Sequence, residues 1–114
     1  MRGDLHLIGF PEVAGRVLAG PHPAVIVSSD RLNRSSGTML VCPLTSRIRH
    51  DENDYIPPYL VKVTARASGL DRDGWVKADQ VFTWPSEAMG ERIGRLNPET
   101  VGQLDAALAF VLDL

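Results

Sequence analysis

The sequence predicts a small, mainly β domain with helices, in which short strands form a strongly bent sheet or barrel and one C-terminal helix closes it. Short apolar runs alternate with polar turns along most of the chain, and only the last segment shows helical spacing of its apolar residues. The chain has 114 residues, which suffices for one domain with a core of its own. We therefore expect a single domain over residues 1–114.

The first two strands are expected on either side of a long loop. Residues 5–8 read as the first strand. Residues 9–23 carry three glycines and three prolines, which predicts a loop. Residues 24–27, with the sequence AVIV, form a continuous apolar run that is typical of a central strand buried on both faces.

The next segment combines a helical turn with a third strand. Ser29 can cap a single helical turn that ends near Arg34. Residues 38–42 read as a buried strand, and Pro43 predicts that this strand ends at a sheet edge or a bulge because proline cannot donate to a ladder. Residues 45–58 then form a long polar loop, of a length that is usually functional or mobile.

The second half of the chain continues the pattern of short strands. The expected elements are a half-exposed strand at 59–63, a turn at 68–74, a strand at 75–83 with a kink near Gln80, a short helical turn at 85–88 and a last strand at 92–96.

The C-terminal segment carries the clearest helix signal. Asn97 is a favourable N-cap, Pro98 fits the first helical position, and Glu99 suits the positive end of the helix dipole. Apolar residues follow at helical spacing, namely Val101, Leu104, Ala107, Leu108, Val111 and Leu112. We expect this helix to bury one face against the sheet.

Composition limits the possible classes of protein. One cysteine, Cys42, excludes an internal disulfide and a multi-thiolate metal site, and no His, Asp or Glu spacing is typical of a metal centre, so we expect no metal or other cofactor. No stretch approaches the roughly 18 apolar residues of a membrane span, and the N-terminus does not read as a signal peptide. We expect a cytoplasmic protein that has no contact with the membrane.

The net charge argues against a general nucleic-acid coat but allows a local basic groove. The net charge is −2, whereas nonspecific nucleic-acid-binding domains are usually strongly basic. Positive charge is mostly arginine, whose guanidinium suits phosphate recognition. Part of it gathers in one stretch, at Arg31, Arg34, Arg47 and Arg49.

Residues 22–47, reading HPAVIVSSDRLNRSSGTMLVCPLTSR, place potential chemistry at the outer ends of two strands. If those strands pair antiparallel, His22 meets Thr45, Ser46 and Arg47. An imidazole can exchange a proton at neutral pH, and hydroxyl and guanidinium groups can stabilise charge on a phosphate. This combination suits binding and cleavage of a phosphodiester. The alternatives are a histidine packed beside prolines, a threonine bonded to its own backbone, and solvated surface residues.

The same segment resembles the MazF/PemK/Kid family of small endoribonucleases from bacterial toxin–antitoxin pairs. Its AVIVSSD, the Asn that follows and PLTSR are similar to family motifs, as are GWVKADQVFT at 74–83 and ERIGRLNPETVGQLDAAL at 91–108. These three matches keep their order over most of the chain. The resemblance implies an SH3-like barrel of the MazF/CcdB type and metal-independent cleavage of single-stranded RNA, including mRNA, at specific sequences. It also implies a homodimer and neutralisation by a MazE-like antitoxin.

The resemblance further implies roles for individual residues. The family's catalytic pair, a basic residue before Pro and the Thr of PLTSR, corresponds to His22 and Thr45. The expected substrate contacts are Ser46, Arg47, Arg49, Asn33 and Gln80. His22 departs from the arginine that most relatives carry, and the acidic residue often found about five places upstream is here Val17, for which Glu12 is a possible substitute.

The departure at position 22 keeps two other classes open. One is a non-catalytic toxin on the same barrel, similar to the gyrase poison CcdB, and the other is a barrel adaptor without toxicity. PLTSR favours the endoribonuclease, because a gyrase poison does not need Thr45.

Overall fold

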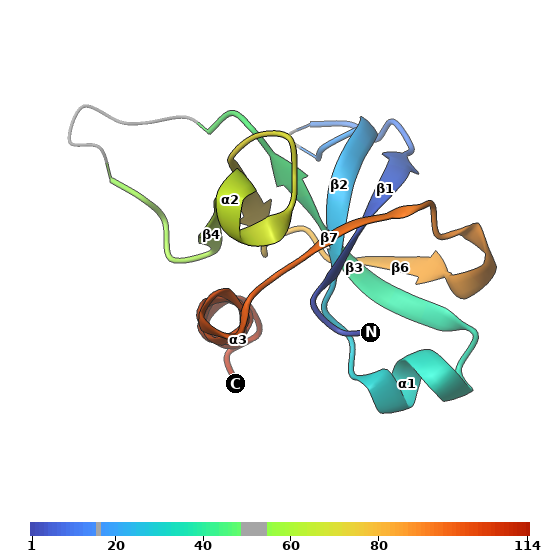
Figure 1. Ribbon diagram of the computed structural model, residues 1–114. Helices are drawn as coiled ribbons and strands as arrows, with labels where there is room; N and C mark the ends of the chain where they lie inside the picture. The colour runs from blue at the N-terminus through green and yellow to red at the C-terminus, as the bar shows by residue number, and fades with distance from the viewer. Residues whose placement is uncertain (16, 49–54) are drawn as a thin grey trace.

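The computed structural model describes residues 1–15, 17–48 and 55–114. Within these ranges the chain forms a curled antiparallel sheet with short helices at its margins and one long C-terminal helix (Figure 1). The strands are β1 Asp4–Phe10, β2 Gly20–Ile26, β3 Thr38–Thr45, β4 Leu60–Val63, β5 Gly74–Lys77, β6 Phe82–Pro85 and β7 Arg92–Arg95. The helices are α1 Asp30–Ser35, α2 Ala65–Ser68, the 3-10 helix η1 Ser86–Ala88, and α3 Pro98–Leu112. The mainly β fold closed by a C-terminal helix is therefore confirmed.

The sheet follows the order β4-β5-β3-β2-β1-β7, and β6 also pairs with β3. β5 and β6 follow one another along the edge of β3 that faces away from β2. Val76 faces Leu44, whereas Phe82, six residues later, faces a residue only three places away, Val41, so three extra residues are accommodated between β5 and β6. This confirms the kink near Gln80, and the ladder on this edge is interrupted opposite Pro43, as its missing donor led us to expect.

The expected loop at residues 9–23 is wrong at both ends. β1 extends to Phe10 and β2 begins at Gly20, and these two residues face each other in the register. Pro21 and Pro23 fit into β2 because β3 pairs only with Ala24–Ile26, which leaves the first half of β2 without a partner on that edge. This open edge of β2 is where His22 lies.

Two other boundaries also differ from the sequence reading. β3 continues through Pro43, which faces Ala24 of β2, and ends at Thr45. α2 was not expected: Thr64 caps it by accepting a hydrogen bond from the Ala67 amide, and Gly69 ends it with φ +85°. Four residues are too few to show helical periodicity, so this helix leaves no clear pattern in the sequence.

The core is divided between the two faces of the curved sheet. Alternate residues of β2 belong to different clusters: Val25 packs with Leu104 and Ala107 of α3, whereas Ile26 packs with Phe10 on the other face. A strand that is buried on both faces reads as a continuous apolar run, as AVIV does. α3 has the expected Asn97 cap, whose side chain accepts from the Thr100 amide at 2.8 Å. Within the described ranges, no helix combines the length and apolar character needed to cross a membrane.

Candidate active site

The antiparallel pairing of β2 and β3 brings the sequence-predicted residues together. Ala24 faces Pro43 in the register. His22, which precedes Ala24, and Thr45, which follows Pro43, therefore lie at the same end of the ladder. His22 Nδ1 lies 3.1 Å from the carbonyl oxygen of Leu44, the residue before Thr45. The expectation that the two strand ends meet is confirmed.

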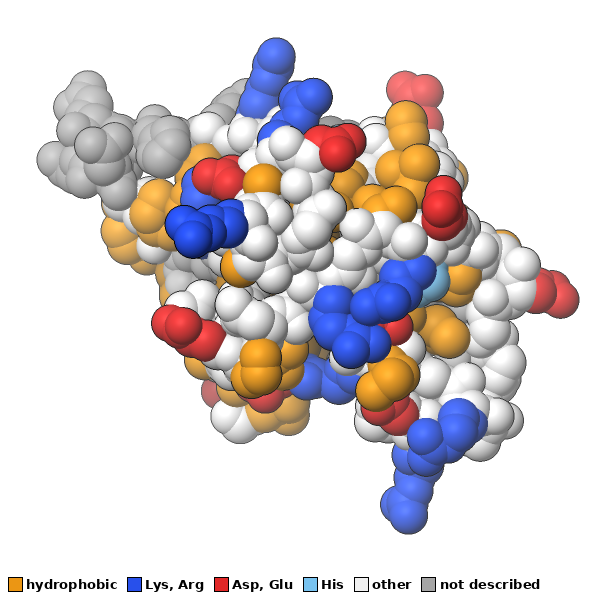
Figure 2. Space-filling model, in the orientation of Figure 1, with side chains coloured by type: hydrophobic (Ala, Val, Ile, Leu, Met, Phe, Trp, Pro, Cys, Tyr) orange, Lys and Arg blue, Asp and Glu red, His pale blue; other side chains and the backbone are white. Residues whose placement is uncertain are grey.

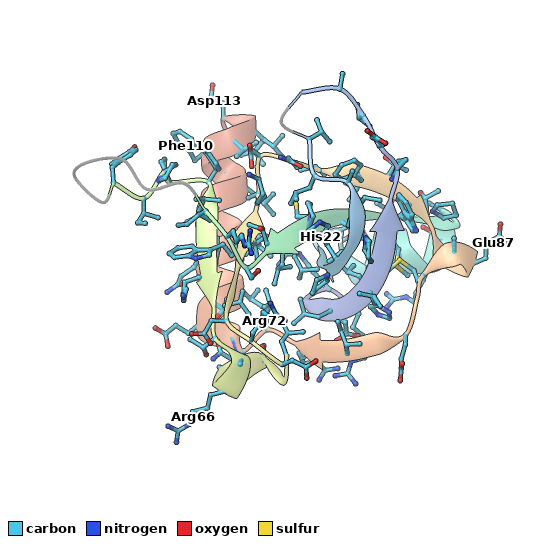
Figure 3. All side chains as sticks on the ribbon, turned by 90° about the horizontal axis from the view of Figure 1, so that it is seen from above. His22, Arg66, Arg72, Glu87, Phe110 and Asp113 are labelled. Carbon is cyan, nitrogen blue, oxygen red and sulfur yellow. The ribbon has the colours of Figure 1, made fainter. Side chains whose placement is uncertain are left out.

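These residues line a groove of about 730 Å³. One wall contains Pro21, His22 and Pro23 of β2 and residues 44–47 at the end of β3, and the other contains residues 69–74 between α2 and β5 with residues 91–93 at the start of β7. In Figure 3, His22 lies near the middle of the molecule, whereas Arg66, Glu87, Phe110 and Asp113 lie at its margins.

His22 is held by two main-chain carbonyl groups. Its Nδ1 faces Leu44 O at 3.1 Å and its Nε2 faces Ala19 O at 3.0 Å. A carbonyl oxygen only accepts hydrogen bonds, so both contacts are hydrogen bonds when both ring nitrogens carry protons. The two carbonyls therefore hold the ring in one orientation beside the end of β3. The ring can transfer a proton to a substrate only if one nitrogen leaves its carbonyl.

Thr45 has a hydroxyl group that is bonded to its own turn. Oγ1 donates to the carbonyl of Arg47 at 2.9 Å and accepts from the Arg47 amide at 3.1 Å. This local pattern is the structural alternative that the sequence left open, and it shapes the chain directly after β3. Ser46 and Arg47 are exposed in the groove. A hydroxyl oxygen has two acceptor sites and one proton, so Thr45 keeps one acceptor site, and it can donate to a phosphate by releasing the Arg47 carbonyl.

The groove contains both charge signs and an apolar part. Its charged residues are Arg47, Arg72 and Arg92 with Asp71, Asp73 and Glu91, and its larger apolar residues are Leu7, Leu44, Leu70 and Ile93. Arginine forks suit phosphate oxygens, carboxylates accept from base amino groups, and exposed aliphatic surface can contact a base face. The groove thus offers the kinds of contact that an RNA strand needs.

The other predicted contacts lie elsewhere. Asn33 sits on α1, where its Nδ2 donates to the Ser28 carbonyl at 3.1 Å and its Oδ1 accepts from the Ser28 hydroxyl. Gln80 Oε1 accepts from the Leu18 amide at 2.9 Å and supports the connection between β1 and β2. Neither residue lines the groove. Arg49 falls outside the described residues. The substrate roles of all three stay predictions.

The wall formed by residues 69–74 and 91–93 was not identified from the sequence. In the sequence, the charged residues 71–73 have the pattern of an ordinary polar turn. Only long-range contacts bring this turn and the start of β7 opposite His22 and Thr45, and a single sequence carries no direct signal for such contacts.

The fold and this groove agree with the class of protein that the comparisons identify. The family model described as "PemK-like, MazF-like toxin of type II toxin-antitoxin system" matches residues 1–112. The chain belongs to this family of toxins.

Individual relatives support the assignment over nearly full length. The endoribonuclease MazF9 of Mycobacterium tuberculosis is 31% identical over 118 residues, with 99% of this chain and 96% of the relative covered. The endoribonuclease EndoA of Bacillus subtilis is 27% identical over 113 residues, covering 99% and 94%.

Solved structures agree with the fold. An endoribonuclease in complex with its cognate antitoxin, from a mycobacterial species, has a TM-score of 0.81 and 25% identity, and the match covers 100% of this chain and 95% of that chain. MazF from Deinococcus radiodurans has a TM-score of 0.79 at 24% identity, with coverage of 99% and 96%, and this likeness concerns the fold.

Proposed function

We propose that this endoribonuclease cleaves single-stranded RNA, including messenger RNA, without a metal ion, that it thereby inhibits translation and growth, and that a cognate antitoxin neutralises it. The observation that carries the proposal is the convergence of His22, Thr45, Ser46 and Arg47 in one groove of a chain that belongs to the toxin family. Metal independence is part of the proposal, and it rests on the family resemblance and on the proton and positive charge that these side chains can supply.

The proposed reaction is an internal transfer at the phosphate. The ribose 2′-oxygen attacks the adjacent phosphorus and the bond from phosphorus to the 5′-oxygen breaks. The 2′-hydroxyl loses its proton to water in the open groove, and the leaving 5′-oxygen gains one. The products are a 2′,3′-cyclic phosphate, which can open to a 3′-phosphate, and a 5′-hydroxyl.

Each site residue has a proposed part in this reaction. Arg47 binds the phosphate through its fork of donors. Thr45 releases the Arg47 carbonyl and donates its hydroxyl proton to a phosphate oxygen, which stabilises the charge that develops there. His22 supplies positive charge as the imidazolium and gives a proton to the 5′-oxygen after one ring nitrogen leaves its carbonyl.

The antitoxin is proposed to occupy the same groove. An antitoxin segment with acidic and apolar side chains can contact the arginines and the apolar residues of the groove at the same time, and so compete with RNA. The mycobacterial structural neighbour is described with its cognate antitoxin. We further propose a symmetric homodimer, as the resemblance implied. Relatives named endoribonuclease favour this function over a gyrase poison or an adaptor.

The experiment that tests the proposal is incubation of the purified protein with a long unstructured RNA in EDTA, followed by analysis of the product ends. We expect cleavage at few sites, with 5′-hydroxyl and cyclic or 3′-phosphate ends. Activity that EDTA abolishes and magnesium restores would refute the metal-free mechanism, and 5′-phosphate ends would refute attack by the 2′-oxygen. A segment of the antitoxin that binds tightly together with RNA would refute the shared groove.

A further inference from the structure

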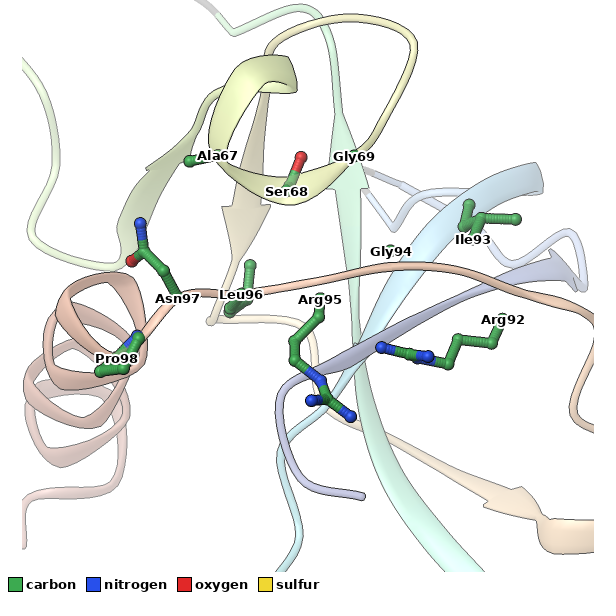
Figure 4. A pocket seen from close by; sticks show the side chains of 10 residues that line it. All are labelled: Ala67, Ser68, Gly69, Arg92, Ile93, Gly94, Arg95, Leu96, Asn97 and Pro98. Atoms are coloured by element: carbon green, nitrogen blue, oxygen red, sulfur yellow. The ribbon is translucent and has the colours of Figure 1, made fainter.

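Two arginines of β7 extend toward the same side of the strand although their spacing is three. In a regular strand, residues three apart point to opposite faces. Here the pairing with β1 is irregular: Leu5 faces Gly94 but His6 faces Arg92, so Ile93 is an extra residue. Such a bulge redirects side chains, and Figure 4 shows Arg92 and Arg95 on the same side of the β7 ribbon.

The two arginines share one buried carboxylate. Asp4 Oδ1 lies 2.9 Å from Arg95 Nε and 3.5 Å from Arg92 Nε, and Asp4 Oδ2 lies 3.1 Å from the terminal ammonium of Met1. The side chain of Asp4 is 8% exposed, whereas those of Arg92 and Arg95 are about half exposed. One negative charge thus holds three positive charges, and the patch formed by Arg92 and Arg95 keeps an excess of positive charge toward solvent. Basic side chains gather over β7 in Figure 2.

This patch continues from the active-site groove. A second hollow of about 560 Å³ is lined by residues 67–69 and 92–98, and it shares Gly69, Arg92 and Ile93 with the groove. Among the described residues, its lining includes the two arginines and no Asp or Glu, in contrast to the mixed charge of the groove. Gly94 lets β7 approach α2 closely, because a Cβ atom there would lie 2.4 Å from the Ser68 carbonyl oxygen. The spacing between α2 and β7 is therefore set by a backbone contact.

We infer that Arg92 and Arg95 form a second phosphate-binding segment, which holds the RNA backbone outside the cleaved linkage. In this arrangement the bound RNA strand runs from the groove at Thr45 and Arg47 past Arg92 to Arg95. The buried carboxylate orients the two guanidinium groups before RNA arrives, and their exposed donors remain available for phosphate oxygens. This inference rests on the proposed function, since it requires an RNA strand in the groove.

The test measures binding rather than cleavage, so that its failure and the failure of the proposed reaction are distinguishable. The probe is a 20-nucleotide single strand of 2′-O-methyl RNA, which lacks the attacking hydroxyl. Its dissociation constant is measured by fluorescence anisotropy as a function of salt for the wild type and for Arg92→Gln/Arg95→Gln. Each lost phosphate contact on a single strand lowers the slope of log K against log salt by about 0.7, so we expect a decrease of about 1.4 and weaker binding at low salt.

Three controls determine what the result means. Arg31→Gln/Arg34→Gln removes the same charge from exposed positions on α1, which do not line either hollow, and we expect the slope of the wild type. Arg92→Lys/Arg95→Lys keeps the charge and should recover most of the slope. Circular dichroism at each salt concentration shows that the variants are folded. An unchanged slope in the folded glutamine variant, or an equal change in the α1 variant, would overturn the inference. The inference would also be overturned if the glutamine variant lost binding only to the antitoxin segment and kept its binding to RNA, because the patch would then belong to the antitoxin.

Discussion

Removal of the Asp4 charge should destabilise the protein, by an amount that depends on pH in a defined direction. Burial raises the pKa of Asp4, but the Arg95 hydrogen bond, the terminal ammonium and the charge of Arg92 outweigh it and hold this pKa below the ordinary 3.8. A carboxylate with a lowered pKa in the folded state contributes stability above its ordinary pKa, and this contribution is lost as the pH falls through the folded value. Asp4→Asn keeps the size and one acceptor oxygen, removes the charge, and replaces the other oxygen with an NH2 donor.

The expected size follows from the partners of Asp4. The Arg95 bond to a carboxylate that is 8% exposed contributes about 1.5 kcal/mol, at the low end for charged hydrogen bonds because Arg95 itself is 53% exposed. The terminal ammonium and Arg92 are more weakly held surface partners, which add about 0.5 kcal/mol together. A loss of about 2 kcal/mol corresponds to a decrease in Tm of about 8 °C for a domain of this size.

The assay is thermal unfolding of the wild type and of Asp4→Asn from pH 7 down to pH 2.5. Glu87→Gln, which changes an exposed carboxylate on η1, is the matched control and should leave Tm nearly unchanged at pH 7. The difference between the wild type and Asp4→Asn should be largest at neutral pH and should shrink below about pH 4. Equal Tm values at pH 7, or a difference that stays constant down to pH 2.5, would refute the reasoning.

Three further predictions concern other parts of the molecule. His22→Arg should keep cleavage activity and should flatten the pH dependence of the cleavage rate between about 5 and 8, where an imidazole ordinarily changes charge. His22→Ala should cleave slowly at every pH. Identical profiles of single-turnover rates for the wild type and His22→Ala would make His22 a packing residue. Burial, with a smaller effect of the Asp79 charge, raises the pKa of Cys42 from 9.0 to about 12. Iodoacetamide at pH 8 should therefore label the folded protein on the order of 10³-fold more slowly than the urea-unfolded chain. Comparable labelling rates would contradict this. Gly94→Ala places a Cβ 2.4 Å from the Ser68 carbonyl and should cost about 1–3 kcal/mol in urea unfolding, and wild-type stability would show that β7 and α2 separate without cost.

The parts of the fold that local chemistry determines could be predicted from the sequence. The cap at Asn97 and the Pro at the first position of α3 are short-range signals, and the structure has both. The continuous apolar run in β2 correctly indicated a strand buried on both faces. The convergence of His22 with Thr45 followed from one assumption, that two neighbouring strands pair antiparallel, and the register confirms it.

The remaining features depend on contacts between distant segments. Pro21 and Pro23 indicated a loop, but they are tolerated in β2 because β3 leaves that half of the strand unpaired. Residues 69–74 and 91–93 form the second wall of the groove only through tertiary packing. The two carbonyl partners of His22 come from Ala19, directly before β2, and from the end of β3, and no pattern in the residue types reveals them.

His22 occupies the position at which the resemblance implies an arginine. Arginine keeps its positive charge at any physiological pH, whereas an isolated imidazole is largely neutral at pH 7. Main-chain carbonyl oxygens at 3.1 Å and 3.0 Å from its two ring nitrogens hold the His22 ring beside the end of β3. Thr45 lies in PLTSR, the other motif on which the resemblance rests.

The measurement that tests the central claim most directly is the single-turnover rate of RNA cleavage in EDTA by the wild type and by Thr45→Ala, at equal thermal stability. A positioned group that stabilises charge in the transition state contributes about 10²–10³-fold, so the account predicts cleavage by the wild type and a loss of that order in the variant. Thr38→Ala, which removes a hydroxyl at the other end of the same strand, should cleave at the wild-type rate. Equal rates for Thr45→Ala and the wild type would contradict the assignment of this groove as the active site.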